Sequence, residues 1–145
     1  MTGVWTVRIA VAGLALTLLS ACASRADSGL KGTSWTATGI SNDNQPVASS
    51  ATVTTITAEF GEDDSLSGFG GCNNYTSTWT TTGPDGLTIG PVGSQLKACE
   101  QDVMDTEQQY FAALAKVATY QLEGNQLTLR DTQGAVQVSF VPTAD

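Results

Sequence analysis

Hydrophobic and polar residues alternate with a period of two along much of this chain, which is typical of half-buried β-strands. The alternation is clearest where Ile56, Ala58 and Phe60 are separated by Thr57 and Glu59. In chain order, strands are predicted at Trp35–Ile40, Thr52–Phe60, the glycine-rich stretch around Phe69, Tyr75–Thr81, Gly86–Ile89, around Tyr120 and Leu122, around Leu127 and Leu129, and at Val136–Phe140. Residues that favour turns lie between them, at Ser41–Pro46, Gly61–Ser65, Gly83–Gly86, Gly124–Asn125 and Asp131–Gly134.

One segment follows a helical period instead. Asp102 is predicted as its N-cap, because a short carboxylate can accept a hydrogen bond from a free N–H of the first turn. Apolar residues follow at helical spacing, at Val103, Met104, Tyr110, Phe111, Leu114 and Val117. Glu107 and Gln108 are predicted on the opposite, polar side, so that the face with Phe111 and Leu114 packs onto the sheet.

The order of these elements predicts the fold class. The strands follow one another in hairpins, and no strand–helix–strand unit repeats, which favours antiparallel pairing. The prediction is a mainly β, α+β domain in which an antiparallel sheet curls toward a small barrel and one helix packs on it.

The first residues predict export and lipid attachment. Ile9–Leu19 is an apolar run of about eleven residues, shorter than the roughly 20 that span a bilayer but suited to a signal peptide. It ends in Leu19-Ser20-Ala21-Cys22, the pattern of a bacterial lipobox, in which the cysteine is acylated and becomes the new N-terminus. We therefore predict a signal peptide at 1–21, an acyl (palmitate) anchor on Cys22, a flexible tether at 22–29 and a domain at 30–142. The alternative is an ordinary signal peptide with a cysteine there by chance.

This assignment places the protein on the extracytoplasmic face of the cell membrane, held by its N-terminal lipid. The chain has 6 Lys and Arg residues against 14 Asp and Glu, a net charge of −8. Such a charge disfavours nucleic acid and anionic head groups as partners. An acidic surface that keeps the protein soluble explains this net charge without any partner.

The two remaining cysteines, Cys72 and Cys99, are expected to form a disulfide, because an even pair in an exported protein is usually oxidised. The glycines before Cys72 indicate a backbone that bends there. Zinc is the competing use, but the chain has no histidine and no Cys-x-x-Cys. Redox-active cysteines usually lie two residues apart, and Cys72 and Cys99 are much farther apart, which disfavours a redox-active pair.

Catalysis and cofactors are not expected. Without histidine a Ser-His-Asp arrangement is impossible. A pair of carboxylates could still hydrolyse a glycoside, and Glu59, Glu62, Asp63 and Asp64 form the one acidic cluster that qualifies. Because they lie at a predicted turn, we interpret them as solvated carboxylates that end a strand. The cluster also lacks the spacing of a known calcium loop.

Four residues are candidates for contact with a ligand or partner: Asn73, Asn74, Tyr75 and Trp79. Asparagines beside a disulfide can recognise a polar group, although they also close turns. Tyr75 and Trp79, together with Trp35 and Tyr110, could line an apolar pocket, although aromatic residues more often fill a core.

These residues carry a family resemblance over nearly the whole predicted domain. Its segments, in order, are Leu30–Trp35, Phe60, Leu66–Tyr75, Ala98-Cys99, Glu107–Leu114, Leu127–Leu129 and Gly134. Together they resemble the META domain family, which includes HslJ-like heat-shock lipoproteins. The Gly-Cys-Asn and Ala-Cys segments are the most specific. Ser94-Gln95 stands where the family often has a Ser-Thr pair, and Lys97 where Met is common.

The resemblance implies an exported, often lipidated protein associated with heat shock, envelope stress or antibiotic tolerance, in a family without established catalytic residues. Two functions remain open. The first is a lipid-anchored interaction module, including a protease inhibitor that presents a loop such as Thr82–Lys97. The second is a carrier of a lipid or small hydrophobic ligand, which needs an open interior of more than about 300 Å³.

Overall fold

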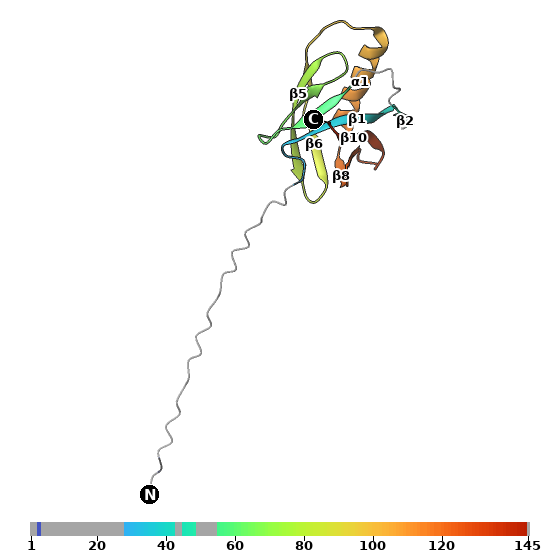
Figure 1. Ribbon diagram of the computed structural model, residues 1–145. Coiled ribbons are helices and arrows are strands. Elements are labelled where there is room, and N and C mark those ends of the chain that lie inside the picture. Colours follow the sequence, from blue (N-terminus) through green and yellow to red (C-terminus); the bar gives the residue numbers. More distant parts are fainter. Residues whose placement is uncertain (1–2, 4–27, 43–44, 49–54, 145) are drawn as a thin grey trace.

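The computed structural model describes residues 3, 28–42, 45–48 and 55–144, and contains strands and one helix in that part of the chain (Figure 1). In order, the elements are β1 (Thr33–Asn42), β2 (Gln45–Ala48), β3 (Thr57–Phe60), β4 (Ser65–Phe69), β5 (Asn74–Thr82), β6 (Gly86–Ile89), β7 (Gly93–Ser94), α1 (Gln101–Lys116), β8 (Thr119–Glu123), β9 (Gln126–Arg130) and β10 (Val136–Pro142).

The strands form one antiparallel sheet that curls into a ring. Neighbouring strands follow the order β10-β9-β8-β6-β5-β4-β3-β1, and β1 also pairs with β10, which closes the ring. Outside this path, β2 pairs with β1, and β7 pairs with β5. Irregular registers at Ala37/Gly39 and Val136/Val138 bend the two strands that close it. The predicted fold class, a mainly β antiparallel sheet with one helix, is confirmed.

The inside of the ring is filled by side chains. The five largest fully buried residues are aromatic: Trp79, Tyr75, Tyr110, Phe60 and Phe140. Edge-on contacts join Phe60 to Trp79 and Tyr110 to Phe140, an arrangement that aromatic rings favour. Helix α1 packs against β1 and β10 and contributes Tyr110 and Leu114 to this core.

The strand predictions hold at most positions and need correction near Ser41–Pro46. Gly86–Ile89 is a strand as predicted, and the turns at Gly124 and Gly134 have positive φ. Four residues of this predicted loop, Ser41, Asn42, Gln45 and Pro46, lie in strands instead, since β1 continues to Asn42 and β2 begins at Gln45. The strands extend into this segment because β1 and β2 pair with each other, which the short polar sequence did not indicate. The strand predicted from Thr52 begins at Thr57, and its first residues, 52–54, lie outside the described part.

Two predictions about the helix were wrong. Its N-cap is Glu100 and its first residue is Gln101, and no side chain caps it. Asp102 lies inside the first turn, where its carboxylate accepts a hydrogen bond from the N–H of Val103. Of the two residues predicted on the polar side, Gln108 is exposed, but the side chain of Glu107 is buried.

The ring has two ends, which we call the Ser28 end and the Cys72 end. At the Ser28 end, the Tyr120 hydroxyl donates to the Ser28 carbonyl, and the Tyr120 N–H donates to the backbone carbonyl of Asp85 in the turn after β5. The Cys72 end holds the β4–β5 connection and the start of α1. Figure 1 shows the described chain entering at the lower end and α1 starting at the upper end.

The predicted signal peptide at 1–21 and lipidation site Cys22 lie outside the described residues, apart from Gly3. Of the predicted tether, only Ser28 and Gly29 are described. Among the described residues, no helix has the length and apolar character needed to cross a membrane.

Candidate functional site

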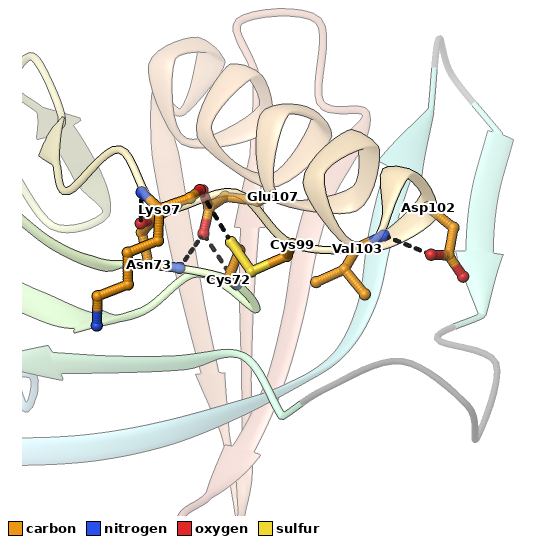
Figure 2. Close-up of a disulfide and its surroundings, with 7 residues drawn as sticks. All are labelled: Cys72, Asn73, Lys97, Cys99, Asp102, Val103 and Glu107. Atoms are coloured by element: carbon orange, nitrogen blue, oxygen red, sulfur yellow. Dashed lines mark hydrogen bonds between the residues drawn. A yellow bond between two sulfur atoms is a disulfide. The ribbon is translucent and has the colours of Figure 1, made fainter.

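A disulfide joins two segments at the Cys72 end. Cys72 and Cys99 are bonded at 2.02 Å, which confirms the predicted pair. The bond connects the turn between β4 and β5 to the segment just before α1 (Figure 2). It therefore fixes the segment from Ser94 to Cys99 against the sheet.

Two glycines before Cys72 explain why the chain can pass so close to the helix. A Cβ on Gly70 would lie 2.7 Å from the Glu107 carboxylate and 2.8 Å from the ring of Phe111. Gly71 has φ of 112°, which side chains rarely tolerate. The glycine-rich sequence thus provides the bend that was predicted, and also the space for α1.

The Glu107 carboxylate binds the backbone of this turn. It accepts hydrogen bonds from the N–H of Cys72 at 3.0 Å, the N–H of Asn73 at 2.6 Å and the Asn73 side-chain amide at 2.7 Å (Figure 2). Only 6% of Glu107 is exposed. Three N–H donors replace the water that a buried carboxylate loses.

Asn73 connects the turn to the segment before α1. Its amide donates to Glu107, while its side-chain oxygen accepts from the Lys97 N–H at 2.8 Å. The Cys72 sulfur lies 3.4 Å from the Lys97 carbonyl; because a disulfide sulfur carries no hydrogen, we interpret this as a packing contact. The segment around Lys97 is therefore held by a covalent bond and by a hydrogen bond.

A groove of about 370 Å³ lies between this segment and α1. Asn73 and Glu107 lie along it, and its remaining lining residues are Ser94, Gln95, Leu96, Lys97, Ala98, Met104, Gln108 and Phe111. Leu96 is 95% exposed. We call this depression the 94–98 groove.

Ser94, the second residue of β7, lines the groove. Gln95, directly after β7, donates its N–H to the Asn74 carbonyl, and this bond flanks Tyr75 and Ser94, which therefore form a non-hydrogen-bonded pair of the β5–β7 ladder. Such pairs alternate in an antiparallel ladder. Ser94, one residue away, must direct its N–H and C=O away from β5. Among the described strands, β5 is the partner of β7.

The four predicted contact residues do not share one surface. Asn73, Tyr75 and Trp79 are 4%, 2% and 2% exposed, whereas Asn74 is exposed. The Trp79 indole N–H donates to the Ser65 carbonyl. Contact with a ligand stays a prediction for these residues, but the structure gives Tyr75 and Trp79 the packing role that aromatic residues usually have.

Tyr75 and Tyr110 form a buried hydroxyl pair. Their oxygens are 2.8 Å apart, and Tyr75 also donates to the Thr57 carbonyl. Burial raises the pKa of Tyr75, against a smaller lowering by the hydrogen bond with Tyr110. Burial also raises the pKa of Tyr110, and the neighbouring Tyr75 adds to this effect.

The acidic cluster on and after β3 is exposed, in agreement with the solvated interpretation. Glu59, Glu62, Asp63 and Asp64 are all exposed. Asp64 forms an ion pair with Lys31 at 2.8 Å. Hydrogen bonds from the Ser65 hydroxyl and N–H lower the pKa of Asp63. In the described part of the chain, no three Cys, Asp or Glu side chains are grouped to hold a metal.

Sequence reasoning missed the two residues that define the groove. Leu96 stands alone in a polar stretch and belongs to no period. Glu107 did carry a signal, because it is three or four residues from Val103, Met104, Tyr110 and Phe111 and so shares their helix face.

Comparison with known proteins finds a matching family model and solved structures of similar fold. The family model of the META domain matches residues 28–144. An NMR structure of a protein from Burkholderia xenovorans has 22% identity and a TM-score of 0.66, over 81% of this chain and 86% of that chain. A crystal structure of a DUF4847 family protein from Bacteroides vulgatus has 14% identity and a TM-score of 0.56, over 80% and 96%. The search of curated proteins returned no match.

Proposed function

This chain belongs to the META domain family, and from that premise we propose that it is a lipid-anchored protein of the cell envelope that acts by binding another envelope component. In this proposal it carries no catalytic site, and it serves under heat or envelope stress.

The observation that carries the proposal is a filled core beside a fixed, exposed loop. Aromatic side chains occupy the interior of the ring, whereas a carrier needs that space for its ligand. Leu96, in contrast, is held in water next to a groove by the disulfide and by Asn73. A rigid surface of this kind loses little conformational entropy when a partner binds.

The lipid anchor is supported by the sequence Leu19-Ser20-Ala21-Cys22 after an apolar run. The absence of histidine from the sequence supports a non-catalytic role, because the commonest general base is missing. The stress association rests on family membership alone.

Fractionation tests the anchor. Cys22→Ala should move the protein from the membrane to the soluble fraction, because a cysteine thiol is needed to accept the acyl chains. Cys22→Ala that remains in the membrane fraction contradicts lipidation at this residue.

A crosslinking pull-down from the native envelope tests the binding function, with co-purifying proteins and lipids identified in parallel. A protein captured reproducibly, and lost on mutation of a surface loop, is the expected result. A bound lipid or small molecule without any protein partner would establish the carrier function instead.

A further inference from the structure

We propose that the exposed segment Ser94–Ala98 is the reactive loop of a protease inhibitor. Its partner is a serine protease whose S1 pocket takes a large apolar side chain. Leu96 enters that pocket, and the bond from Leu96 to Lys97 is presented to the catalytic serine. This inference rests on the proposed binding function and names the chemistry of the partner.

The side chain of Leu96 is free to enter the pocket of another protein. It is 95% exposed, and every residue from Ser94 to Ala98 is exposed. The loop lies at the Cys72 end, where it leads into α1 (Figure 1). Since a single exposed leucine is common on protein surfaces, the role of Leu96 depends on how the backbone on either side of it is held.

Two backbone N–H groups hold the loop against the fold, one on each side of Leu96. The N–H of Gln95 donates to the Asn74 carbonyl at 3.2 Å, and the N–H of Lys97 donates to the Asn73 side-chain oxygen at 2.8 Å. N–H groups two residues apart point to the same side of an extended chain. The loop contains neither helix nor turn, so it is held in an extended form.

The alternate residues leave their backbone groups free for a partner. Ser94 is opposite Tyr75 in a non-hydrogen-bonded pair, so its N–H and C=O point away from β5. Leu96 makes no backbone hydrogen bond to any described residue. A peptide in a serine-protease cleft pairs with the enzyme as an extended strand, through the residue before the cleaved bond and the one two positions earlier. Leu96 and Ser94 occupy those two positions.

The same contacts select Leu96 over Lys97 as the residue that enters S1. The N–H of Lys97 is bonded to Asn73, and its carbonyl oxygen lies 3.4 Å from the Cys72 sulfur. The residue in S1 must instead give its carbonyl oxygen to the oxyanion hole. The loop therefore fits a protease with an apolar S1 pocket, as in chymotrypsin, and not trypsin, whose pocket holds an aspartate.

Contacts after the Leu96–Lys97 bond favour inhibition over digestion. Attack by the catalytic serine on the Leu96 carbonyl forms an ester and breaks the bond to Lys97, whose nitrogen leaves as an amine with the serine proton; water then hydrolyses the ester. Here Asn73 holds that nitrogen, and the disulfide holds the chain at Cys99, three residues after Leu96. The amine stays beside the ester, so it can re-form the peptide bond and return the proton to the serine.

Glu107 fixes Asn73 for this task. Only 4% of Asn73 is exposed, and its amide nitrogen donates to the Glu107 carboxylate at 2.7 Å. Because an ionised carboxylate only accepts hydrogen bonds, the amide oxygen must face Lys97 (Figure 2). A loop that is fixed before binding loses less conformational entropy in the complex.

Inhibition assays with the purified full chain and short chromogenic substrates test the proposal. We expect inhibition of chymotrypsin and subtilisin, which both accept large apolar side chains in S1, and no inhibition of trypsin. Leu96→Ala should raise the inhibition constant for chymotrypsin about thirtyfold or more, as is usual for loss of a central interface residue. Val141→Ala, at an exposed apolar residue of β10, is the matched control and should leave inhibition unchanged.

A change of specificity is the sharper test, because a misfolded variant cannot produce it. Leu96→Lys should inhibit trypsin and lose inhibition of chymotrypsin, since the side chain in S1 now fits the other pocket. Val141→Lys should not inhibit trypsin.

Asn73→Ala tests how the cleaved bond is held. Chymotrypsin should cut this variant between Leu96 and Lys97 about tenfold faster than the wild type, because the nitrogen of Lys97 is no longer held. Asn125→Ala, at an exposed asparagine between β8 and β9, is the control. Mass analysis locates the cut, which separates two fragments only after the disulfide is reduced. Equal rates for Asn73→Ala and Asn125→Ala contradict this role of Asn73.

Two results would overturn the inference: no inhibition of chymotrypsin or subtilisin by the wild type, or a Leu96→Lys variant that does not inhibit trypsin. The native pull-down separates this inference from the proposed function. A partner that is not a protease, captured equally by wild type and by Leu96→Ala, contradicts the reactive loop but leaves the binding function standing. A serine protease captured by the wild type and lost with Leu96→Ala supports both.

Discussion

At the scale of single residues, Glu107 has the largest structural consequence. Its carboxylate is the common acceptor for Cys72, Asn73 and the Asn73 amide. We expect Glu107→Gln to lower the free energy of unfolding by about 2–3 kcal/mol, because an amide has one acceptor atom and would turn its NH₂ toward donors. Urea denaturation measures the change.

Gln108 provides the matched control for this prediction. It follows Glu107 on the helix and is exposed, so Gln108→Glu makes the reverse exchange in water and should change stability by less than about 0.5 kcal/mol. Equal effects of the two substitutions would show that the hydrogen bonds of Glu107 are not stabilising.

The buried tyrosine pair predicts an alkaline limit of stability. Because the pKa values of Tyr75 and Tyr110 are raised in the folded protein, only the unfolded chain loses these protons just above pH 10. The folded state then binds more protons, so stability falls as pH rises above about 10, by up to about 1.4 kcal/mol per pH unit for each tyrosine. Below about pH 10 both states keep these protons, so the contribution of the two tyrosines to stability does not change with pH.

Urea denaturation at several pH values between 8 and 11 measures this dependence. Tyr110→Phe removes one of the two titrating groups and leaves the hydrogen bond from Tyr75 to Thr57 possible, so its stability should fall less steeply with pH. The same slope in both proteins would contradict a raised pKa for Tyr110.

At the scale of elements, the disulfide ties the segment before α1 to the β4–β5 turn, across a separation of 27 residues. Closing a loop of this length should stabilise the fold by about 3–4 kcal/mol. The double variant Cys72→Ser with Cys99→Ser should therefore unfold at a lower urea concentration. In the wild type, alkylation without reductant should label neither cysteine in intact-mass analysis, and labelling of both would rule out the bond in solution.

Most strands could be predicted from the sequence because apolar and polar residues alternate along a strand with one buried and one solvent-exposed face. Ile56, Ala58 and Phe60 all point into the core, as the pattern indicated. β2 and β7 were not predicted: a strand of two residues such as Gly93–Ser94 has no period, and only its pairing with Tyr75 and Thr76 defines it.

The candidate site was predictable only in part. Cys72, Cys99 and the glycine bend follow from residue types that have few uses. The spacing of Glu107 from the apolar residues of the helix indicates its burial but not its role, because its partner is a turn more than 30 residues earlier in the chain. Long-range pairing of this kind leaves no local pattern.

At the scale of the whole molecule, the start of the described chain and the 94–98 groove lie at opposite ends of the ring. The described chain begins at the Ser28 end, beside Tyr120 and the turn at Asp85. The 94–98 groove opens at the other end, about 27 Å away along β5. If lipid is attached before Ser28, the end with Asp85 faces the membrane and the groove faces away from it.

This polarity can be tested with a photo-crosslinking amino acid placed at one of two exposed positions, Asp85 or Leu96, in the membrane-bound protein. A crosslinker at Leu96 should capture protein and little lipid, because the length of the domain separates it from the bilayer. At Asp85 the ratio of lipid to protein products should be higher, since the tether of residues 22–28 spans at most about 23 Å when extended. Cys22→Ala should abolish lipid products at both positions. Equal capture of lipid from Leu96 and from Asp85 would mean that the domain lies on its side, with the groove against the membrane.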